Sequence, residues 1–105
     1  MANVLTRLAR TIESRLGADE KKSYAAKLFA RGPEKCAEKF GEEAIEAIIA
    51  AVKNDKKNLT EEAADVLFHL CVMLSSRGVK FEDVLAELER REGTSGIIEK
   101  ENRKK

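Results

Sequence analysis

The chain has 105 residues, of which 43% are hydrophobic and 37% charged, with a formal net charge of +1. This length is enough for one domain but not for two, so we expect a single domain over residues 1–105. The balanced charge provides no field that would attract nucleic acid or a membrane surface. No apolar run reaches the roughly 18 residues of a membrane span, so we expect a cytoplasmic protein without membrane or nucleic-acid partners.

The predicted elements are all helices, because apolar residues recur at intervals of three and four and no alternating segment is long enough for a strand. The first helix carries apolar residues at positions 4, 5, 8, 12 and 16, and Gly17 can end it in a left-handed conformation. This segment is amphipathic and Arg-bearing like a transit peptide, but its helical spacing and Glu13 favour the first helix of the fold.

The next two helices are marked by a serine, a glycine and a proline. Ser23 can cap a short helix that ends at Gly32, and Pro33 occupies the natural first position of a long helix that runs to about Lys53. We expect the long helix to have a main apolar stripe, and Ile45 and Ile49 to form a second stripe on another side. The main stripe consists of Cys36, Phe40, Ala44, Ala47, Ile48 and Ala51.

The last two predicted helices lie between residues 58 and 92. Asn58 and Glu61 have the spacing of a capping box, and the helix that they start runs to Gly78. It is apolar around most of its circumference, so we expect it to be central and buried. A final helix ends before Gly93, and residues 95–105 form a basic tail that could be flexible. The fold class is therefore all-α, an antiparallel bundle of four to five helices with Cys36 and Cys71 in its core.

Two carboxylate pairs lie on consecutive predicted helices. Glu43 and Glu46 are three residues apart, as are Glu62 and Asp65, so each pair shares one side of its helix. Glutamates on exposed helix faces are common, and the first pair alone would be interpreted as solvated. Asp65, however, falls inside an apolar helix, where an unpaired carboxylate is costly. All-oxygen ligands suit Mg²⁺, so the four carboxylates predict a magnesium site.

Other candidates are less specific. Lys27, Arg31 and Lys39 precede the carboxylates and could offset phosphate charge, although most helical lysines are merely solvated. His69 shares the face of Glu62 and Asp65. Its default interpretation is a hydrogen-bonded core histidine, and the alternatives are a substrate contact or the orientation of a carboxylate.

The two acidic pairs resemble the E-x-x-E…E-x-x-D signature of the all-α nucleotide pyrophosphohydrolases, the MazG-like superfamily. Three stretches are similar to the phosphoribosyl-ATP pyrophosphohydrolase family within it and cover nearly the whole chain: residues 23–51, 61–74 and 91–104. The acidic signature defines only the superfamily. The Ser-Tyr start and the Gly-Thr-Ser-Gly-Ile-Ile-Glu-Lys tail point to the family, and the acidic positions show no departure from its pattern.

The resemblance implies an activity and an assembly. The activity is Mg²⁺-dependent hydrolysis of phosphoribosyl-ATP to phosphoribosyl-AMP and pyrophosphate, the second step of L-histidine biosynthesis. The assembly is a homodimer or higher homo-oligomer that pairs through helices and forms its active site between them, with Ile45 and Ile49 as a reasonable contact. Some family members are fused to phosphoribosyl-AMP cyclohydrolase, and we expect this chain to be the free-standing form.

A mechanism follows as a hypothesis. Mg²⁺ would bridge the triphosphate, neutralise charge on the leaving pyrophosphate and lower the pKa of an attacking water. Glu42 would accept the proton from that water. The metal ligands would be Glu43, Glu46, Glu62 and Asp65, and the substrate would be bound by Lys27, Arg31, Lys39 and His69 and by the tail residues Lys100 and Arg103.

Three other functions compete with this one. A house-cleaning nucleoside triphosphate pyrophosphohydrolase of the same superfamily would share the metal site and fold, and the distinctive tail argues against it. A ferritin-type di-metal bundle uses Glu-x-x-His, but Val66 stands three residues before His69. A non-enzymatic helical interaction module would leave Asp65 on the buried side of its helix without explanation.

Overall fold

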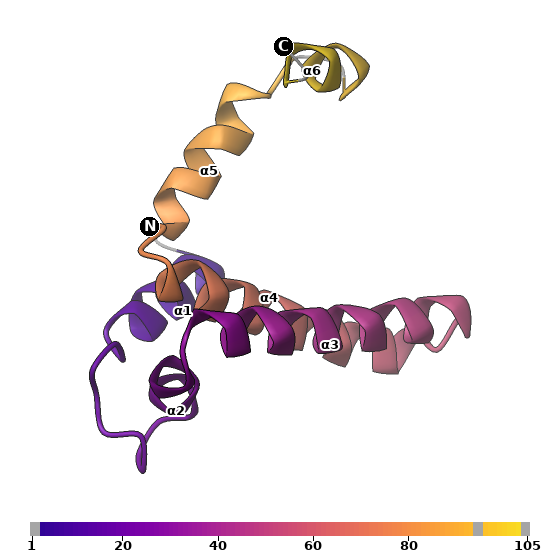
Figure 1. Cartoon of the computed structure of the whole chain (residues 1–105). Coiled ribbons are helices and arrows are strands. Elements are labelled where there is room, and N and C mark those ends of the chain that lie inside the picture. The colour runs from indigo at the N-terminus through magenta and orange to yellow at the C-terminus, as the bar shows by residue number, and fades with distance from the viewer. Residues whose placement is uncertain (1–2, 94–95, 104–105) are drawn as a thin grey trace.

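The computed structural model describes residues 3–93 and 96–103, and these ranges contain six α-helices and no strand (Figure 1). The all-α prediction is confirmed. None of these helices is both long enough and apolar enough to span a membrane. In chain order they are α1 (Val4–Glu13), α2 (Tyr24–Arg31), α3 (Pro33–Val52), α4 (Lys56–Ser76), α5 (Phe81–Arg90) and α6 (Gly96–Arg103).

Helix α6 lies where the sequence predicted only a basic tail. Residues 95, 104 and 105 of that tail lie outside the described residues, and the flexibility of the tail stays a prediction.

Helix α4 is the central element, as predicted, but only its second half is buried in the core. The expectation that Asp65 lies on the buried side of this helix is wrong, because Asp65 falls in the first half and is exposed. Helices α1, α2, α3 and α5 all pack against α4. Both cysteines are buried and free, which confirms their assignment to the core. The buried cluster consists of Ala9, Ile12, Ala25, Leu28, Cys36, Cys71, Val72 and Phe81.

The short helix α2 and the long helix α3 are separated by a single residue, Gly32. Ser23 caps α2 as predicted, because its hydroxyl accepts a hydrogen bond from the Ala26 N–H at 3.2 Å. Gly32 ends α2 with a φ of 96°, a left-handed value that a residue with a Cβ rarely adopts, and Pro33 begins α3. An added Cβ at Gly32 would meet nothing closer than 3.8 Å, so conformation rather than space requires glycine here.

Helices α3 and α4 form an antiparallel hairpin that projects beyond α1 and α2 (Figure 1). The predicted start of α4 at Asn58 is wrong. The helix begins at Lys56, and the Asp55 side chain caps it by accepting a hydrogen bond from the Asn58 N–H at 3.1 Å. Asn54 reverses the chain in a left-handed conformation with φ 58°, so the turn is shorter than the polar segment suggested.

The first helix also ends earlier than predicted. It stops at Glu13, and the segment that follows it is a turn in which the Arg15 N–H donates to the Ile12 carbonyl at 2.9 Å. This i→i−3 bond tightens the chain away from the α-helical path. Leu16 is consequently exposed rather than part of the apolar face.

The predicted main stripe of α3 is partly wrong. Ile48 is 60% exposed and Ala51 is also exposed, whereas Ala50, which the stripe omitted, is fully buried. The inner face runs through Cys36, Glu43 and Ala50, which are spaced by two turns of helix. A carboxylate, that of Glu43, therefore occupies a position on the face that packs against α4. The apolar pattern of the sequence is interrupted at this position, so it does not identify the buried face.

The packing of α1 against this core should contribute measurably to the free energy of unfolding. Ile12 is only 2% exposed, so Ile12→Ala should lower the free energy of unfolding by about 2–5 kcal/mol through lost burial and the cavity left behind. Urea unfolding at one fixed protein concentration measures this change. Val4→Ala is the matched control, because Val4 on the same helix is 70% exposed and its truncation should cost much less. Equal losses for the two variants would contradict this packing.

Candidate active site

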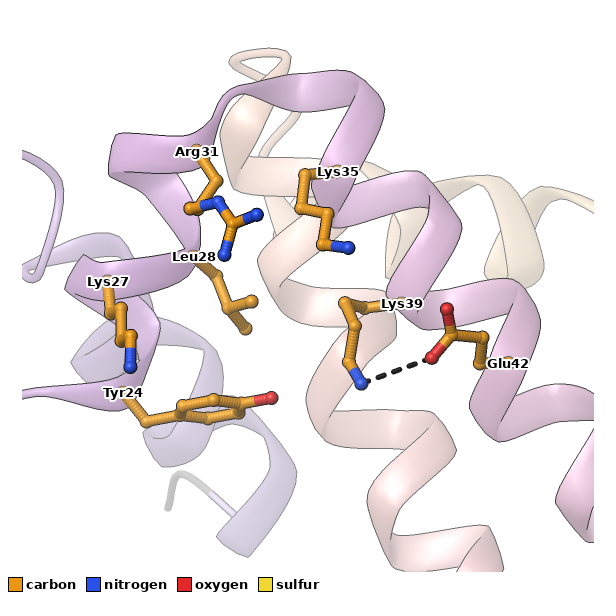
Figure 2. Close-up of a pocket in the computed structure, with 7 residues that line it drawn as sticks. All are labelled: Tyr24, Lys27, Leu28, Arg31, Lys35, Lys39 and Glu42. Atoms are coloured by element: carbon orange, nitrogen blue, oxygen red, sulfur yellow. Dashed lines mark hydrogen bonds and ion pairs between the residues drawn. The ribbon is translucent and has the colours of Figure 1, made fainter.

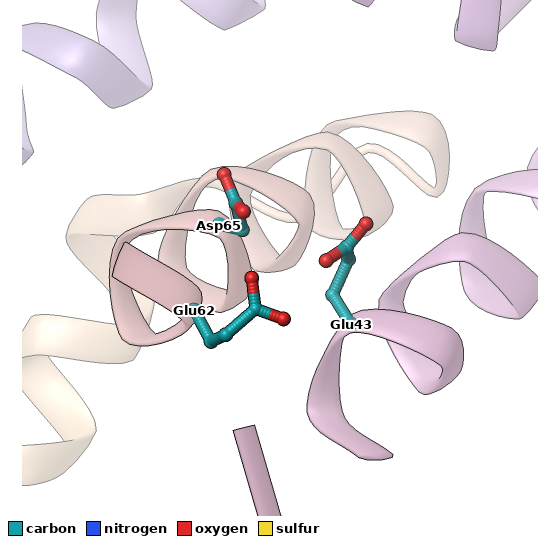
Figure 3. A group of neighbouring side chains, drawn as sticks. All are labelled: Glu43, Glu62 and Asp65. Atoms are coloured by element: carbon teal, nitrogen blue, oxygen red, sulfur yellow. The ribbon is translucent and has the colours of Figure 1, made fainter. Parts of the chain in front are cut away.

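Three of the four predicted metal ligands converge between α3 and α4. One carboxylate oxygen each from Glu43, Glu62 and Asp65 lies within 4.8 Å of the other two. Glu43 comes from α3, and the other two come from one side of α4 (Figure 3). The three-residue spacing on α4 places its two carboxylates side by side, and the antiparallel hairpin brings Glu43 opposite them.

The environment of this acidic group disfavours negative charge. Burial, followed by a hydrogen bond that the protonated Glu43 donates to Glu46 and by the charges of the neighbouring carboxylates, raises the pKa of Glu43 from 4.5 to about 7. Burial and the charges of Glu46 and Asp65 raise the pKa of Glu62 as well. Glu46, the fourth predicted ligand, is therefore a close neighbour of the group even though it is exposed. A cation would relieve this repulsion, and the all-oxygen donor set fits Mg²⁺.

His69 lies behind the acidic group rather than in open contact with solvent. It is 4% exposed, and its Nε2 is 3.9 Å from Glu43 Oε1, which is too long for a direct hydrogen bond. Burial, together with the positive charge of Lys39, lowers the pKa of His69. Its Nδ1 is buried and has no hydrogen-bond partner among the described residues.

A second feature is a basic pocket of about 220 Å³ between α2 and α3 (Figure 2). The pocket contains all three basic residues that we predicted from the sequence to bind phosphate, Lys27, Arg31 and Lys39. Its lining consists of Tyr24, Lys27, Leu28 and Arg31 from α2, and of Lys35, Lys39 and Glu42 from α3. Two successive turns of each helix provide the cations, at positions four residues apart, so their side chains point into one opening.

The two halves of the basic pocket differ in how their charges are balanced. On α3, Lys35 pairs with Glu38 at 2.9 Å, and Lys39 donates a hydrogen bond to Glu42 at 3.2 Å, which raises the pKa of Lys39. On α2, Lys27 and Arg31 are both exposed. Glu42, the predicted general base, thus lines the basic pocket instead of joining the acidic group.

Aromatic rings connect the basic pocket to the acidic group. The Tyr24 ring stacks on Phe68 with a centroid distance of 6.0 Å and meets the His69 ring edge-on at 5.9 Å. Sequence reasoning missed Tyr24 and Lys35 as site residues. Lys35 could have been found from its position one turn before Lys39, but Tyr24 could not, because its place depends on how α2 packs against α4.

The two tail candidates are not brought to this site. Lys100 and Arg103 lie on α6, which Figure 1 places at the far end of α5, away from the α3–α4 hairpin. Their assignment to substrate binding stays a prediction.

Comparison with known proteins gives a consistent result. Residues 5–92 match the family model described as phosphoribosyl-ATP pyrophosphohydrolase. The chain is 71% identical over 96 residues to a phosphoribosyl-ATP pyrophosphatase of Rhodobacter capsulatus, covering 91% of this chain and 93% of that protein. It is 66% identical over 101 residues to proteins of the same name from Cereibacter sphaeroides and Dinoroseobacter shibae, covering 96% of this chain in both cases and 98% and 99% of those proteins. The chain therefore belongs to the phosphoribosyl-ATP pyrophosphohydrolase family.

Proposed function

We propose that this protein is a cytoplasmic, Mg²⁺-dependent enzyme that hydrolyses phosphoribosyl-ATP to phosphoribosyl-AMP and pyrophosphate, the second step of L-histidine biosynthesis. The observation that carries the proposal is the convergence of Glu43, Glu62 and Asp65 within 4.8 Å, next to a pocket lined by four cations. Membership of the family supports the choice of substrate.

Glu43, Glu62 and Asp65 would hold the metal, with Glu46 as a fourth ligand. When bound, Mg²⁺ would supply charge neutralisation for the triphosphate and the leaving pyrophosphate, and it would acidify the attacking water. Because Glu43 lies on the packed face of α3, its carboxylate has little freedom to turn away. Helix α3 therefore holds this one ligand in place before the ion arrives.

The remaining residues have roles consistent with their surroundings. The burial of His69 beside Glu43 supports the orientation of that carboxylate more than a direct substrate contact. Glu42 stays the proposed proton acceptor, at the boundary between the acidic group and the basic pocket. Lys27, Arg31 and Lys39 would contact phosphates.

We also propose that two chains pair through the α3–α4 hairpin. The radius of gyration is 15.6 Å, above the roughly 13 Å expected for a compact domain of this length. The outer face of α3 and part of α4 expose large apolar side chains, which pairing would bury. Two such hairpins side by side would make a four-helix bundle. These side chains are Ile45, Ile48, Ile49 and Val52 on α3 and Leu67 on α4.

The metal role can be tested with Asp65→Asn, which removes one charge and keeps the side-chain shape. Mg²⁺ affinity and turnover of phosphoribosyl-ATP should each fall on the order of 100-fold. Loss of a residue that only hydrogen-bonds to a metal ligand typically costs about 10- to 100-fold, and Asp65 would be a ligand itself. Calorimetric titration and pyrophosphate release measure the two quantities. The control is Glu61→Gln on the same helix, which is outside the acidic group. A fully active Asp65→Asn enzyme would rule out this metal site.

The pKa of Glu43 predicts a pH dependence. Its value of about 7 in the fold exceeds the ordinary 4.5, so the folded state holds this proton more tightly than the unfolded chain. The stabilisation from this proton is complete below about pH 4.5 and is lost as the pH rises through about 7.

A cation competes with the same proton, so Mg²⁺ affinity should increase from about pH 6 to about pH 8, and binding near pH 7 should release protons. Calorimetry in two buffers of different ionisation enthalpy measures that release. Glu61→Gln should behave as wild type, and an Mg²⁺ affinity that does not change with pH would contradict the prediction.

The pairing surface can be tested with Ile48→Glu. A charge at the centre of the apolar face should shift the protein from dimer to monomer in sedimentation equilibrium, because the charge would have to be desolvated on pairing. Val4→Glu is the control, since Val4 is 70% exposed, slightly more than Ile48 at 60%, but lies on α1. A wild-type chain that is monomeric at high concentration would refute the surface, as would an unchanged Ile48→Glu dimer.

A further inference from the structure

We propose that the basic pocket between α2 and α3 binds the single phosphate of the substrate's phosphoribosyl group, and that the enzyme thereby prefers phosphoribosyl-ATP to ATP. This inference rests on the proposed function. It assigns the two charged ends of the substrate to two different places, the triphosphate to the acidic group with its metal and the monophosphate to the pocket.

The charge balance of the basic pocket is the first support. Its lining carries four cations and one carboxylate. Lys35 and Lys39 have ion-pair partners on their own helix, whereas Lys27 and Arg31 have no such partner among the described residues. Two like charges four residues apart on α2 repel each other, which is unfavourable for the helix. An anion that occupies the pocket would remove that cost.

The chemistry of these cations suits a phosphate monoester. Such a group carries close to two negative charges at neutral pH and presents three acceptor oxygens. Arg31 can donate two parallel hydrogen bonds to it, and Lys27 and Lys35 can each donate one. The substrate has such a group on the ribose attached to its adenine base, and ATP does not.

The spacing between the two places is the second support. Lys39 in the basic pocket and Glu46 beside the acidic group are two turns apart on α3, about 10 Å along the axis. A nucleoside with phosphates at opposite ends can span this separation. Tyr24 lines the basic pocket and is half exposed, and its ring is edge-on to His69, whose Nε2 is 3.9 Å from Glu43. An aromatic surface thus lies where the base of a bridging substrate would pass.

The kinetic test compares Arg31→Gln with Arg15→Gln, a control that removes an exposed arginine from the turn after α1. For Arg31→Gln, the KM for phosphoribosyl-ATP should rise about 10- to 100-fold, the usual loss of a hydrogen bond to a charged group. Its kcat should stay within about threefold of wild type, and so should kcat/KM for ATP. Arg15→Gln should leave all of these values unchanged.

A binding test without Mg²⁺ isolates the basic pocket from the metal site. Phosphoribosyl-AMP and AMP differ only in the phosphoribosyl group. Wild type and Arg15→Gln should bind phosphoribosyl-AMP at least about tenfold more tightly than AMP, and Arg31→Gln should lose that preference. Thermal unfolding of each variant checks that the fold is intact, which the exposure of Arg31 leads us to expect.

The outcomes separate this inference from the proposed function. Suppose that wild type hydrolyses phosphoribosyl-ATP but that Arg31→Gln raises the KM for phosphoribosyl-ATP and the KM for ATP by the same factor. The pocket then binds the triphosphate, and the inference is wrong although the proposed function stands. Retention of the phosphoribosyl-AMP preference by Arg31→Gln would also overturn it. If wild type releases no pyrophosphate from phosphoribosyl-ATP, the proposed function fails, whatever the binding test gives.

Discussion

The packing of α3 against α4 is the constraint on which the rest of the structure depends. It buries Cys36 and Ala50 and, between them, turns the Glu43 carboxylate toward Glu62 and Asp65. A protein that only needed stability would place an apolar side chain at this position, because desolvating a carboxylate is costly. The raised pKa of Glu43 records that cost. The α3–α4 hairpin is thus less stable than it would be with an apolar side chain at position 43, and in return three carboxylates lie close together.

Much of this arrangement could be predicted from the sequence, because local signals specify it. Ser23, Gly32 and Pro33 define α2 and the start of α3 through capping and backbone geometry, and the spacing of the acidic residues places both pairs on consecutive helices. The rotation of α3 could not be predicted, since its inner face contains a carboxylate and its outer face contains isoleucines. The basic pocket was only half predictable. Its cations are visible in the sequence, but the contribution of Tyr24 depends on the angle between α2 and α4.

The acidic group and the basic pocket are complementary parts of one surface. The acidic group repels an anion until a cation is present, while the basic pocket attracts an anion at all times. Lys39 and Glu42, which pair with each other, mark the boundary between the two regions. Under the proposed function, this separation of charge would let the α3–α4 hairpin and α2 bind opposite ends of a polyanionic substrate without the acidic and basic side chains pairing with one another.

The joint at Gly32 and Pro33 determines how far apart the two walls of the basic pocket stand. Neither residue has a polar side chain, and neither lines the pocket, yet the left-handed φ of Gly32 directs where α3 departs from α2. The width of the pocket is therefore encoded in backbone geometry rather than in the residues that would touch a ligand. Substitutions at these two positions in relatives could accordingly change the width of the pocket, and with it the ligand preference, while every charged side chain is kept. A comparison restricted to the residues that contact the ligand would overlook such a change.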